Sequence, residues 1–404
     1  MKHTLSILIS FALALAMWGM LPGGRAEAAT TYFSQGSLAP NLTSSWNTSR
    51  VGGGSSPSNF TSGDVFVIQN GHNMTTSATW SISGTGSKLQ IENGGTLTAT
   101  SAITVASATT FQIDSGGTYV HDNTTAYGGS VFQGTESFDA ASTVILNNSN
   151  STGPSNIAFG NLTVNFTSDP GSAVNLGGNI STINGELKIV STSTREFRLS
   201  GSTTLNLTIG GDLTVQGGIL DFANSAGSNT SRTINLGGSF NQTGGTVKAT
   251  GTSDPTSLNF TGVNKTFTQS SGTFTTTNIN FAVNSGASLT LNNNLSVATS
   301  RALTVSGTLN TGTNVVSGAG SFTLASGGTL GIGSSAGITA SGATGNIQVS
   351  GTRTYNTSAN YTYNGSGAQD TGAGLPSTVK NLSISSGSNT TLNSSLSSLI
   401  VTGT

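Results

Sequence analysis

One short pattern returns along this chain with its apolar residues, glycine pair and threonine all in register. Residues 91–97 read IENGGTL, and residues 113–119, which begin 22 positions later, read IDSGGTY. Residues 209–218 return 27 positions later as residues 236–245, and a looser copy begins 33 positions before them at Leu176. A repeat of such variable length is typical of a β-solenoid, because its coils can extrude loops of different size.

Short stretches of alternating apolar residues lie between the glycine pairs. Residues 64–68, 88–91, 205–209 and 302–305 each predict a strand with one apolar face. Charged residues make up only 7% of the chain, and stretches with a helical composition are missing. We therefore expect an all-β fold, a right-handed parallel β-helix or β-solenoid with an N-terminal cap. An array of β-sandwich repeats is the alternative, because strands at this spacing also fit that class.

A similarity over a longer range joins residues 161–164, 278–281 and 381–384, which read NLTV, NINF and NLSI. Each of these segments is followed by a further strand signal rich in Leu and Asn. The similarity predicts cassettes of roughly 100 residues laid over the individual coils.

The first 28 residues have the features of a secretory signal peptide. Lys2 precedes an apolar, uncharged stretch over residues 5–21, and residues 26–28, AEA, supply the small-x-small pattern that signal peptidase reads. We expect cleavage after Ala28. An uncleaved membrane anchor is the alternative, but no stop-transfer pattern follows.

The mature chain is expected to contain two parts. Residues 29–85 form an N-terminal cap with the first strands, and residues 86–404 contain the solenoid repeats, truncated at the C-terminus. An open solenoid end exposes unpaired strand edges that invite aggregation, so bulky apolar residues are expected to cover it. The expected cap residues are Trp46, Phe60, Phe66, Ile68 and Trp80.

Glycine pairs mark the expected corners of the coils. Gly95, Gly117, Gly218 and Gly245 occupy equivalent positions in the repeats. We expect all four to adopt backbone angles that a β-carbon would make costly, which glycine adopts without strain.

Composition argues against several classes of partner and cofactor. The mature chain carries roughly two net negative charges and no basic cluster, so we expect no nucleic-acid partner and no membrane-surface helix. No membrane span is expected once the signal peptide is cleaved. It has no cysteine, which excludes disulfides and thiolate metal sites. His72 and His121 lack a second ligand at a recognisable spacing and are interpreted as corner or cap residues. We expect no cofactor and no metal.

No pair of acidic residues lies in a motif that would place it beside a base. Polysaccharide lyases and hydrolases built on β-helices need clustered Asp or Glu with Lys or Arg on one face. The densest charged group is Arg195-Glu196-Arg198, which we interpret as an exposed strand or loop pair. We therefore expect no catalytic residues, and a lyase-like or hydrolase-like β-helix remains an alternative.

A glycan-binding module is another alternative. Tyr355, Tyr361 and Tyr363 lie near Asn364 in the sequence, and aromatic faces can stack on sugar rings. Packing on a strand face is the favoured interpretation of these tyrosines, because aromatic residues are common in strands.

Two regions carry motifs found in a known class of surface protein. Residues 363–369 read YNGSGAQ and are followed by GLP at 374–376 and NLSI at 381–384; residues 63–72 read GDVFVIQNGH. These segments resemble repetitive proteins secreted by Gram-negative bacteria, often with type IX sorting domains. The chain departs from that pattern because it ends in mid-cassette without such a domain.

The resemblance implies a structural or adhesin-like protein that is secreted or held at the outer cell surface. Its partners would be surface glycans or other cell-surface proteins. The family motifs bring no catalytic residues, and they leave the ligand and the oligomeric state open.

Overall fold

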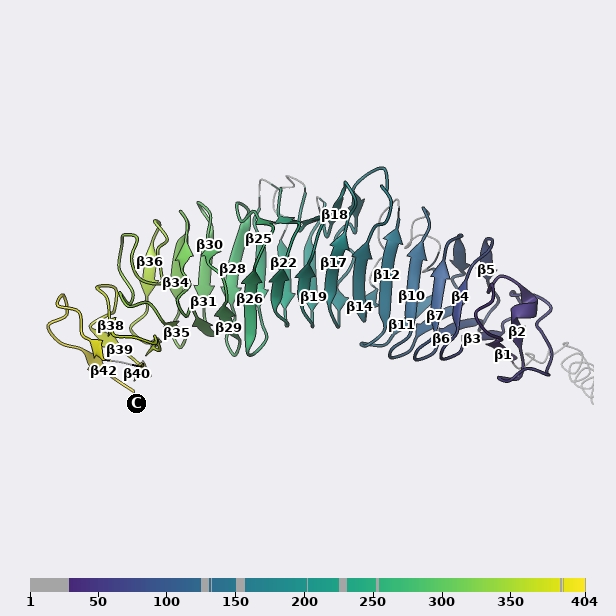
Figure 1. Ribbon diagram of the computed structural model, residues 1–404, viewed down its shortest axis with the longest axis horizontal. Coiled ribbons are helices and arrows are strands. Elements are labelled where there is room, and N and C mark those ends of the chain that lie inside the picture. Colours follow the sequence, from purple (N-terminus) through teal and green to yellow (C-terminus); the bar gives the residue numbers. More distant parts are fainter. Residues whose placement is uncertain are drawn as a thin grey trace, which may run out of the picture.

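The computed structural model describes residues 29–124, 131, 133–149, 157–201, 203–224, 231–251, 254–385, 387 and 389–403. These residues form a rod of stacked coils (Figure 1). Apart from one short 3-10 helix, η1 (Thr43–Ser45), every described element is a strand. The expected fold class is confirmed, since the chain is an all-β, parallel β-solenoid of about 14 turns.

One sheet, called the long sheet here, runs along most of the rod. Its 14 strands are, in order, β4 (Asn73–Thr75), β7 (Thr96–Ala99), β10 (Thr118–Asp122), β12 (Thr143–Asn148), β14 (Asn161–Asn165), β17 (Leu187–Ser191), β20 (Leu213–Val215), β23 (Phe240–Gln242), β26 (Lys265–Gln269), β29 (Ser288–Leu291), β32 (Thr308–Asn310), β35 (Thr329–Ile332), β37 (Asn360–Tyr363) and β40 (Asn381–Ile384). Each strand pairs in parallel with its neighbours, so each belongs to a different coil.

Two further sheets follow one another along a second side of the rod. The N-terminal sheet contains, in order, β11 (Thr135–Phe138), β9 (Thr110–Ile113), β6 (Lys88–Ile91), β3 (Val65–Ile68), β1 (Thr31–Ser34) and β2 (Trp46–Asn47). The central sheet contains β13 (Ala158–Phe159), β16 (Thr182–Ile183), β19 (Leu205–Ile209), β22 (Arg232–Leu236), β25 (Thr256–Phe260), β28 (Ile279–Val283), β31 (Ala302–Val305), β34 (Ser321–Leu324) and β36 (Arg353–Tyr355). The rings of Phe138 and Phe159 pack 6.0 Å apart where the two sheets meet.

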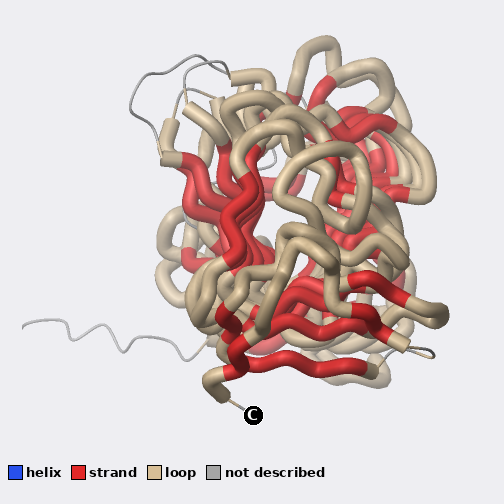
Figure 2. Tube along the Cα trace, turned by 90° about the vertical axis from the view of Figure 1, so that its left-hand side faces the viewer, coloured by secondary structure: helices blue, strands red, loops and turns tan. Residues whose placement is uncertain are grey.

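Shorter sheets complete the coils. The side sheet contains β15 (Val174–Asn175), β18 (Glu196–Arg198), β21 (Ile219–Asp221), β24 (Thr246–Lys248) and β27 (Thr273–Phe274). The two-stranded pairs are β5 (Trp80–Ile82) with β8 (Ile103–Val105), β30 (Leu295–Ser296) with β33 (Val316–Ser317), β38 (Gln369–Asp370) with β41 (Thr390–Thr391), and β39 (Thr378–Val379) with β42 (Ile400–Val401). In the end-on view of Figure 2 the strands form the sides of the coil and the loops form its corners.

The pairing direction decides between the two expected architectures. Among the described strands, every pair is parallel except β1 with β2. Sandwich repeats are built from antiparallel strands. The alternative of a β-sandwich array is therefore wrong.

The strand register confirms the two closest sequence repeats. Lys88 pairs with Thr110 and Thr96 with Thr118, which is the 22-residue return. Ile209 pairs with Leu236, which is the 27-residue return. The length of a coil nevertheless varies, and this variation limits what repeats in the sequence can reveal.

The looser repeats do not correspond to equivalent positions. Ile209 pairs with Ile183 and not with Leu176, which follows β15 of the side sheet. Residues 161–164 and 381–384 lie on the long sheet, whereas residues 278–281 lie at β28 of the central sheet. The expectation of cassettes of about 100 residues is therefore wrong, because similar strand sequences occur on different sides of the coil.

Alternate side chains of each strand point into the rod and form files of stacked apolar residues. One file on the long sheet joins, in register, Met74, Leu97, Tyr119, Val144, Leu162, Leu187, Leu213, Phe240 and Phe267, all of them buried. The rings of Phe240 and Phe267 stack 5.0 Å apart at an angle of 9°. This alternation of buried and outward positions is the period of two that the sequence shows.

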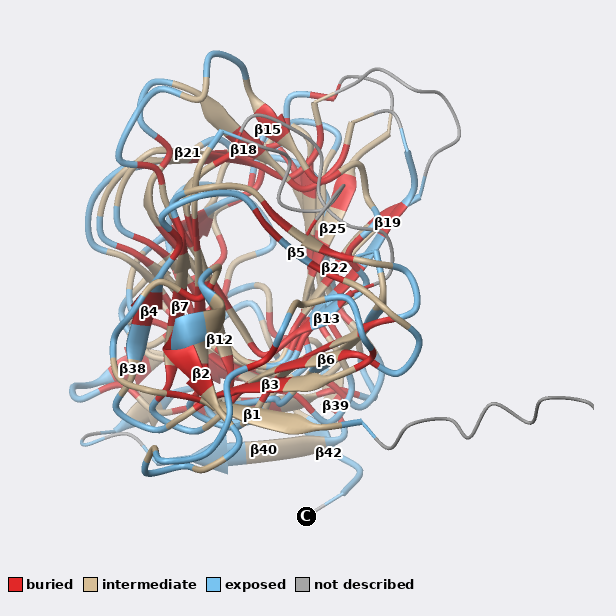
Figure 3. Cartoon of the chain, turned by 90° about the vertical axis from the view of Figure 1, so that its right-hand side faces the viewer, coloured by how far each residue is buried: buried red, intermediate tan, exposed pale blue. Residues whose placement is uncertain are grey.

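An aromatic cluster lies at the N-terminal end of the rod. Trp46 and Trp80 are buried with their rings 5.8 Å apart, and Phe60 packs against both Phe66 and Trp80. Ile68, two residues after Phe66 on β3, is buried in the core of the rod. Figure 3 looks onto this end, where β1 and β2 lie beside β3. The antiparallel β2 occupies the edge of the N-terminal sheet and interrupts the parallel stacking there.

The four corner glycines are not equivalent. Gly218 and Gly245 have the expected positive φ, +67° and +64°, and precede strands of the side sheet. Gly95 and Gly117 precede strands of the long sheet, and the positive φ lies at the residue before each of them. A β-carbon on Gly117 would still lie 2.8 Å from the Ile91 carbonyl oxygen, so crowding, and not φ, restricts this position to glycine.

We expect Gly245→Ala to lower the free energy of unfolding by about 1–3 kcal/mol, because the alanine would have to adopt a positive φ. Its β-carbon would also lie 2.5 Å from the Gly218 carbonyl oxygen. Gly367→Ala is the matched control, since its φ is not positive and no heavy atom lies within 4 Å of an added β-carbon. Equal melting temperatures for the two variants would contradict this assignment of the corner.

We expect Trp46→Ala to destabilise the protein by about 3–5 kcal/mol, because it removes a buried aromatic side chain from the cap. The opened edge should also promote aggregation, which light scattering during heating would detect. Leu42→Ala serves as the control, because Leu42 is 49% exposed. A variant that stays monomeric and as stable as the control would show that this cluster does not close the rod.

Candidate functional site

The two histidines among the described residues, His72 and His121, serve the structure of the N-terminal half. His72 Nδ1 accepts a hydrogen bond from the Gly36 amide (3.2 Å) and lies 2.7 Å from the Ser34 hydroxyl oxygen, which ties the cap to the first coil. His121 is buried, with its Nδ1 3.0 Å from the Tyr119 hydroxyl oxygen. Within the described residues, no three His, Cys, Asp or Glu side chains come close enough to hold a metal ion.

The densest charged group forms a network across the side sheet. Glu196 binds Arg198 at 2.6 Å on its own strand and Lys248 at 2.5 Å on β24, two coils further along. The three side chains are only 20–27% exposed. The sequence predicted an exposed strand or a loop here, and Glu196 and Arg198 lie on a strand but are only partly exposed. The sequence did not predict the partner Lys248.

The environment of Glu196 contains two opposing effects. Burial by itself would raise the pKa of its carboxyl group. Hydrogen bonds from Lys248 and Arg198 outweigh burial and hold this pKa below its usual range. Both carboxylate oxygens are engaged by cations. Such a carboxylate joins coils but is poorly suited to accept a proton from a substrate.

A second ion pair lies close to this network in the sequence. Asp169 binds Arg195 at 2.8 Å on the surface, and the hydrogen bond from Arg195 lowers the pKa of Asp169 to about 2. Neither ion pair places an acid beside a free base, which a hydrolase or a lyase needs.

Hydroxyl and amide side chains cover the outer face of the central sheet. Asn235 and Asn259 lie in register on neighbouring strands, and the Asn259 amide donates to the Asn235 side-chain oxygen at 3.0 Å. The same ladder occurs on the long sheet, where Asn381 donates to Asn360 at 2.8 Å. The outer face of the central sheet is polar yet uncharged, because its outward files contain mainly Thr, Ser and Asn in place of Lys and Glu.

The tyrosines of the alternative glycan platform point inward. Tyr361 and Tyr363 are fully buried, and their hydroxyls donate to the backbone oxygens of Asn356 (2.8 Å) and Thr371 (2.7 Å). Burial raises the pKa of both hydroxyls above the usual range. No face of either ring is left for a sugar, so the platform is excluded and strand-face packing is their role.

The other two residues of that platform do not replace it. Tyr355 is partly buried against the Phe322 ring, 5.9 Å away, and its hydroxyl donates to the Thr339 oxygen at 3.2 Å. Asn364 donates to the Asn310 side-chain oxygen at 3.1 Å. Both side chains are therefore used for packing and for bonds between coils.

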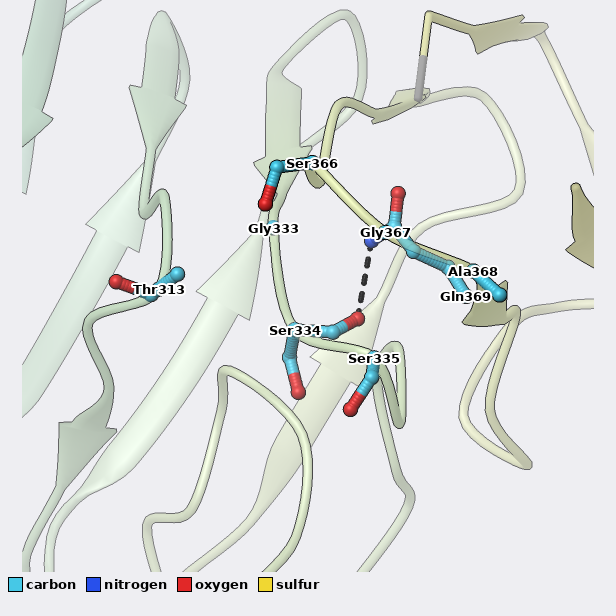
Figure 4. Close-up of a pocket in the computed structure, with 8 residues that line it drawn as sticks. All are labelled: Thr313, Gly333, Ser334, Ser335, Ser366, Gly367, Ala368 and Gln369. Atoms are coloured by element: carbon cyan, nitrogen blue, oxygen red, sulfur yellow. Dashed lines mark hydrogen bonds between the residues drawn. The ribbon is translucent and has the colours of Figure 1, made fainter. Parts of the chain in front are cut away.

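A cleft with a volume of about 400 Å³ lies next to Asn364. It is lined by Thr313, by residues 333–335 and by residues 366–369, which come from three successive coils (Figure 4). Its side-chain functional groups are the hydroxyls of Thr313, Ser334, Ser335 and Ser366, with the amide of Gln369. No charged side chain lines it.

Two buried amide side chains fix the walls of this cleft. Gln369 accepts from the Gly365 amide (2.8 Å) and donates to the backbone oxygens of Ile332 (2.9 Å) and Ser334 (3.0 Å), the last shown as the dashed line in Figure 4. Asn346 accepts from the Ser334 amide at 2.9 Å and donates to two carbonyls of the preceding coil. The hydroxyls therefore stand on a rigid backbone.

The comparisons with known proteins add no identification. No family model matches this chain, and no significant match was found among curated proteins or solved structures. In the part of the chain that the structure describes, no helix has the length and apolar character needed to cross a bilayer. The expected signal peptide, residues 1–28, lies outside the described residues.

We expect Glu196→Gln to lower the free energy of unfolding at pH 7 by about 1 kcal/mol, because it removes two partly buried ion pairs. The pKa of Glu196 is lower in the folded state than in the unfolded state, where it is about 4.3. The ion pairs therefore stabilise the fold fully at a pH above the unfolded-state pKa, and this stabilisation is lost as the pH falls through the folded-state pKa. Melting curves of both proteins should therefore converge on acidification from pH 7 to about pH 3.

The control for this variant is Asp169→Asn, which breaks an ion pair exposed on both sides. We expect a smaller loss of stability at pH 7 from this change, since solvent and salt screen exposed charges. A loss in Glu196→Gln no larger than in the control, or one that persists at low pH, would contradict the role of the network.

Proposed function

We propose that this chain is an exported β-solenoid module, secreted or held at the outer cell surface, with a structural or adhesive role and no catalytic activity. The observation that carries the proposal is the outer surface of the rod. Its files of uncharged hydroxyl and amide groups repeat from coil to coil, and the described acids of its densest charged groups are engaged by cations. Such a surface is better suited to many weak binding contacts along the rod than to a single catalytic site.

Two features of the sequence support export and a surface location. The apolar stretch over residues 5–21 has the pattern of a secretory signal, and the motifs at 63–72 and 363–384 resemble repetitive surface proteins of Gram-negative bacteria. The absence of cysteine fits a protein stabilised by backbone pairing between coils. Surface glycans and other cell-surface proteins are the partners that this role implies.

Export is tested by fusing residues 1–28 to an alkaline phosphatase that is active only outside the bacterial cytoplasm. We expect activity together with cleavage after Ala28, because the segment has the charge and apolar length that the export machinery reads. Leu13→Arg is the control, since a charge within the apolar stretch should abolish both signals. A fusion that remains inactive, or one no better than the control, would contradict export.

The noncatalytic role is tested with purified residues 29–404 incubated with pectins, alginates and β-glucans. We expect no release of reducing ends or unsaturated products, because the acids of the densest charged groups are held by cations and are poorly suited to exchange a proton with a substrate. In parallel, beads coated with the folded protein should adhere to glycan or cell-surface material, and beads coated with heat-unfolded protein should not. Turnover that disappears in an Asp→Ala or Glu→Ala variant would overturn the proposal.

A further inference from the structure

The cleft beside Asn364 gathers hydroxyl groups at the spacing of the coils. Thr313 lies between β32 and β33, Ser334 and Ser335 follow β35, and Ser366 follows β37. Because these strands pair as neighbours in the long sheet, the three sets of hydroxyls recur at about 4.8 Å along the rod. A ligand lying along this axis would meet hydroxyls from three coils.

The chemistry of the lining limits the class of ligand. A hydroxyl group donates one hydrogen bond and accepts others, so the cleft offers both functions at several points. An ionic ligand would lose its hydration without finding a counter-charge in the lining. A neutral ligand that carries several hydroxyl groups matches the lining.

The walls of the cleft also meet the requirements of a preformed site. Gln369 and Asn346 are 3% and 0% exposed, and their amides hold the loops at both walls through bonds to the backbone. A rigid site avoids the ordering cost that a flexible loop brings to binding. The volume of about 400 Å³ lies within the range of small-molecule sites.

We propose that this cleft binds a short segment of a neutral saccharide, held by hydrogen bonds to the Ser and Thr hydroxyls and to the exposed backbone around Gly367. No aromatic side chain lines the cleft, so ring stacking makes no contribution. Affinity therefore rests on hydrogen bonds, and we expect a Kd of about 1 mM. Many copies on one surface would raise the avidity of such a weak site.

Saturation-transfer NMR with the folded mature protein tests this proposal, with cellotetraose, chitotetraose and mannotetraose as separate probes. We expect at least one neutral probe to bind, and tetragalacturonate, which carries a carboxylate on each sugar, to bind at least about tenfold more weakly. Equal binding of the acidic probe would overturn the neutral class. No binding of any neutral probe at about 10 mM would overturn the site.

Two variants locate the binding. Gly367→Leu should fill the cleft and weaken binding by about tenfold or more, and the backbone tolerates a side chain there because no heavy atom lies within 4 Å of an added β-carbon. Thr357→Leu, in an exposed turn of the same coil, is the matched control and should bind as the parent does.

The double variant Ser335→Ala/Ser366→Ala removes two hydroxyl groups from the cleft. It should weaken binding by about fivefold or more with an unchanged melting temperature. Binding that survives both cleft variants would contradict the assignment.

The saccharide-binding measurements and the export experiment can fail independently of each other. The cleft is tested on purified protein in solution, so an inactive phosphatase fusion would remove the proposed surface role and leave the saccharide site in place. Failure of every neutral probe would remove this site and leave the rod free to adhere through its other faces.

Discussion

The other features of this protein depend on the backbone hydrogen bonds between successive coils. The amides of Thr96, Thr118 and Thr143 donate to the carbonyls of His72, Gly95 and Gly117, each at 2.9–3.0 Å, so one coil is tied to the next along a single line. Such a ladder places equivalent side chains in files about 4.8 Å apart. A file of like charges at that spacing would repel itself, whereas Asn, Ser and Thr can bond to one another or pack. The low content of charged residues, 7%, fits this constraint.

The corners and interior of the coil place the other demands on the sequence. Glycine is needed where a turn takes a positive φ, as at Gly245, and where a neighbouring carbonyl leaves no room for a β-carbon, as at Gly117. At other corners the backbone turns inward and leaves polar groups that side chains must satisfy. Near the C-terminal end, the amide side chains of Gln369 and Asn346 satisfy such groups by hydrogen bonding to backbone N–H and C=O groups. The cleft between these two loops is therefore a product of how the coils close.

The sequence predicted the fold class and the two closest repeats, because these depend on alternation and on glycine pairs that can be read locally. It did not predict which side of the coil each strand occupies. Coils vary from 18 residues, between Thr143 and Asn161, to 31 residues, between Thr329 and Asn360, so similar motifs fall on different sheets. The ion pair between Glu196 and Lys248 spans 52 residues and becomes apparent only when two coil lengths are known. Alternation alone did not place Tyr361 and Tyr363, because a tyrosine is compatible both with a packed interior and with a ligand-binding surface.

The unequal coils have a mechanical consequence. Because each coil is bonded mainly to its two neighbours, a pull on the C-terminal end of the rod would strip coils off one at a time and would not shear the whole rod at once. Every detachment would release a length of chain set by that coil, so the extension would come in steps of uneven size. Where Glu196 and Lys248 join strands two coils apart, the coil that carries Lys248 would stay attached until that bridge broke. A rod of this kind would yield gradually under load and keep its remaining coils folded.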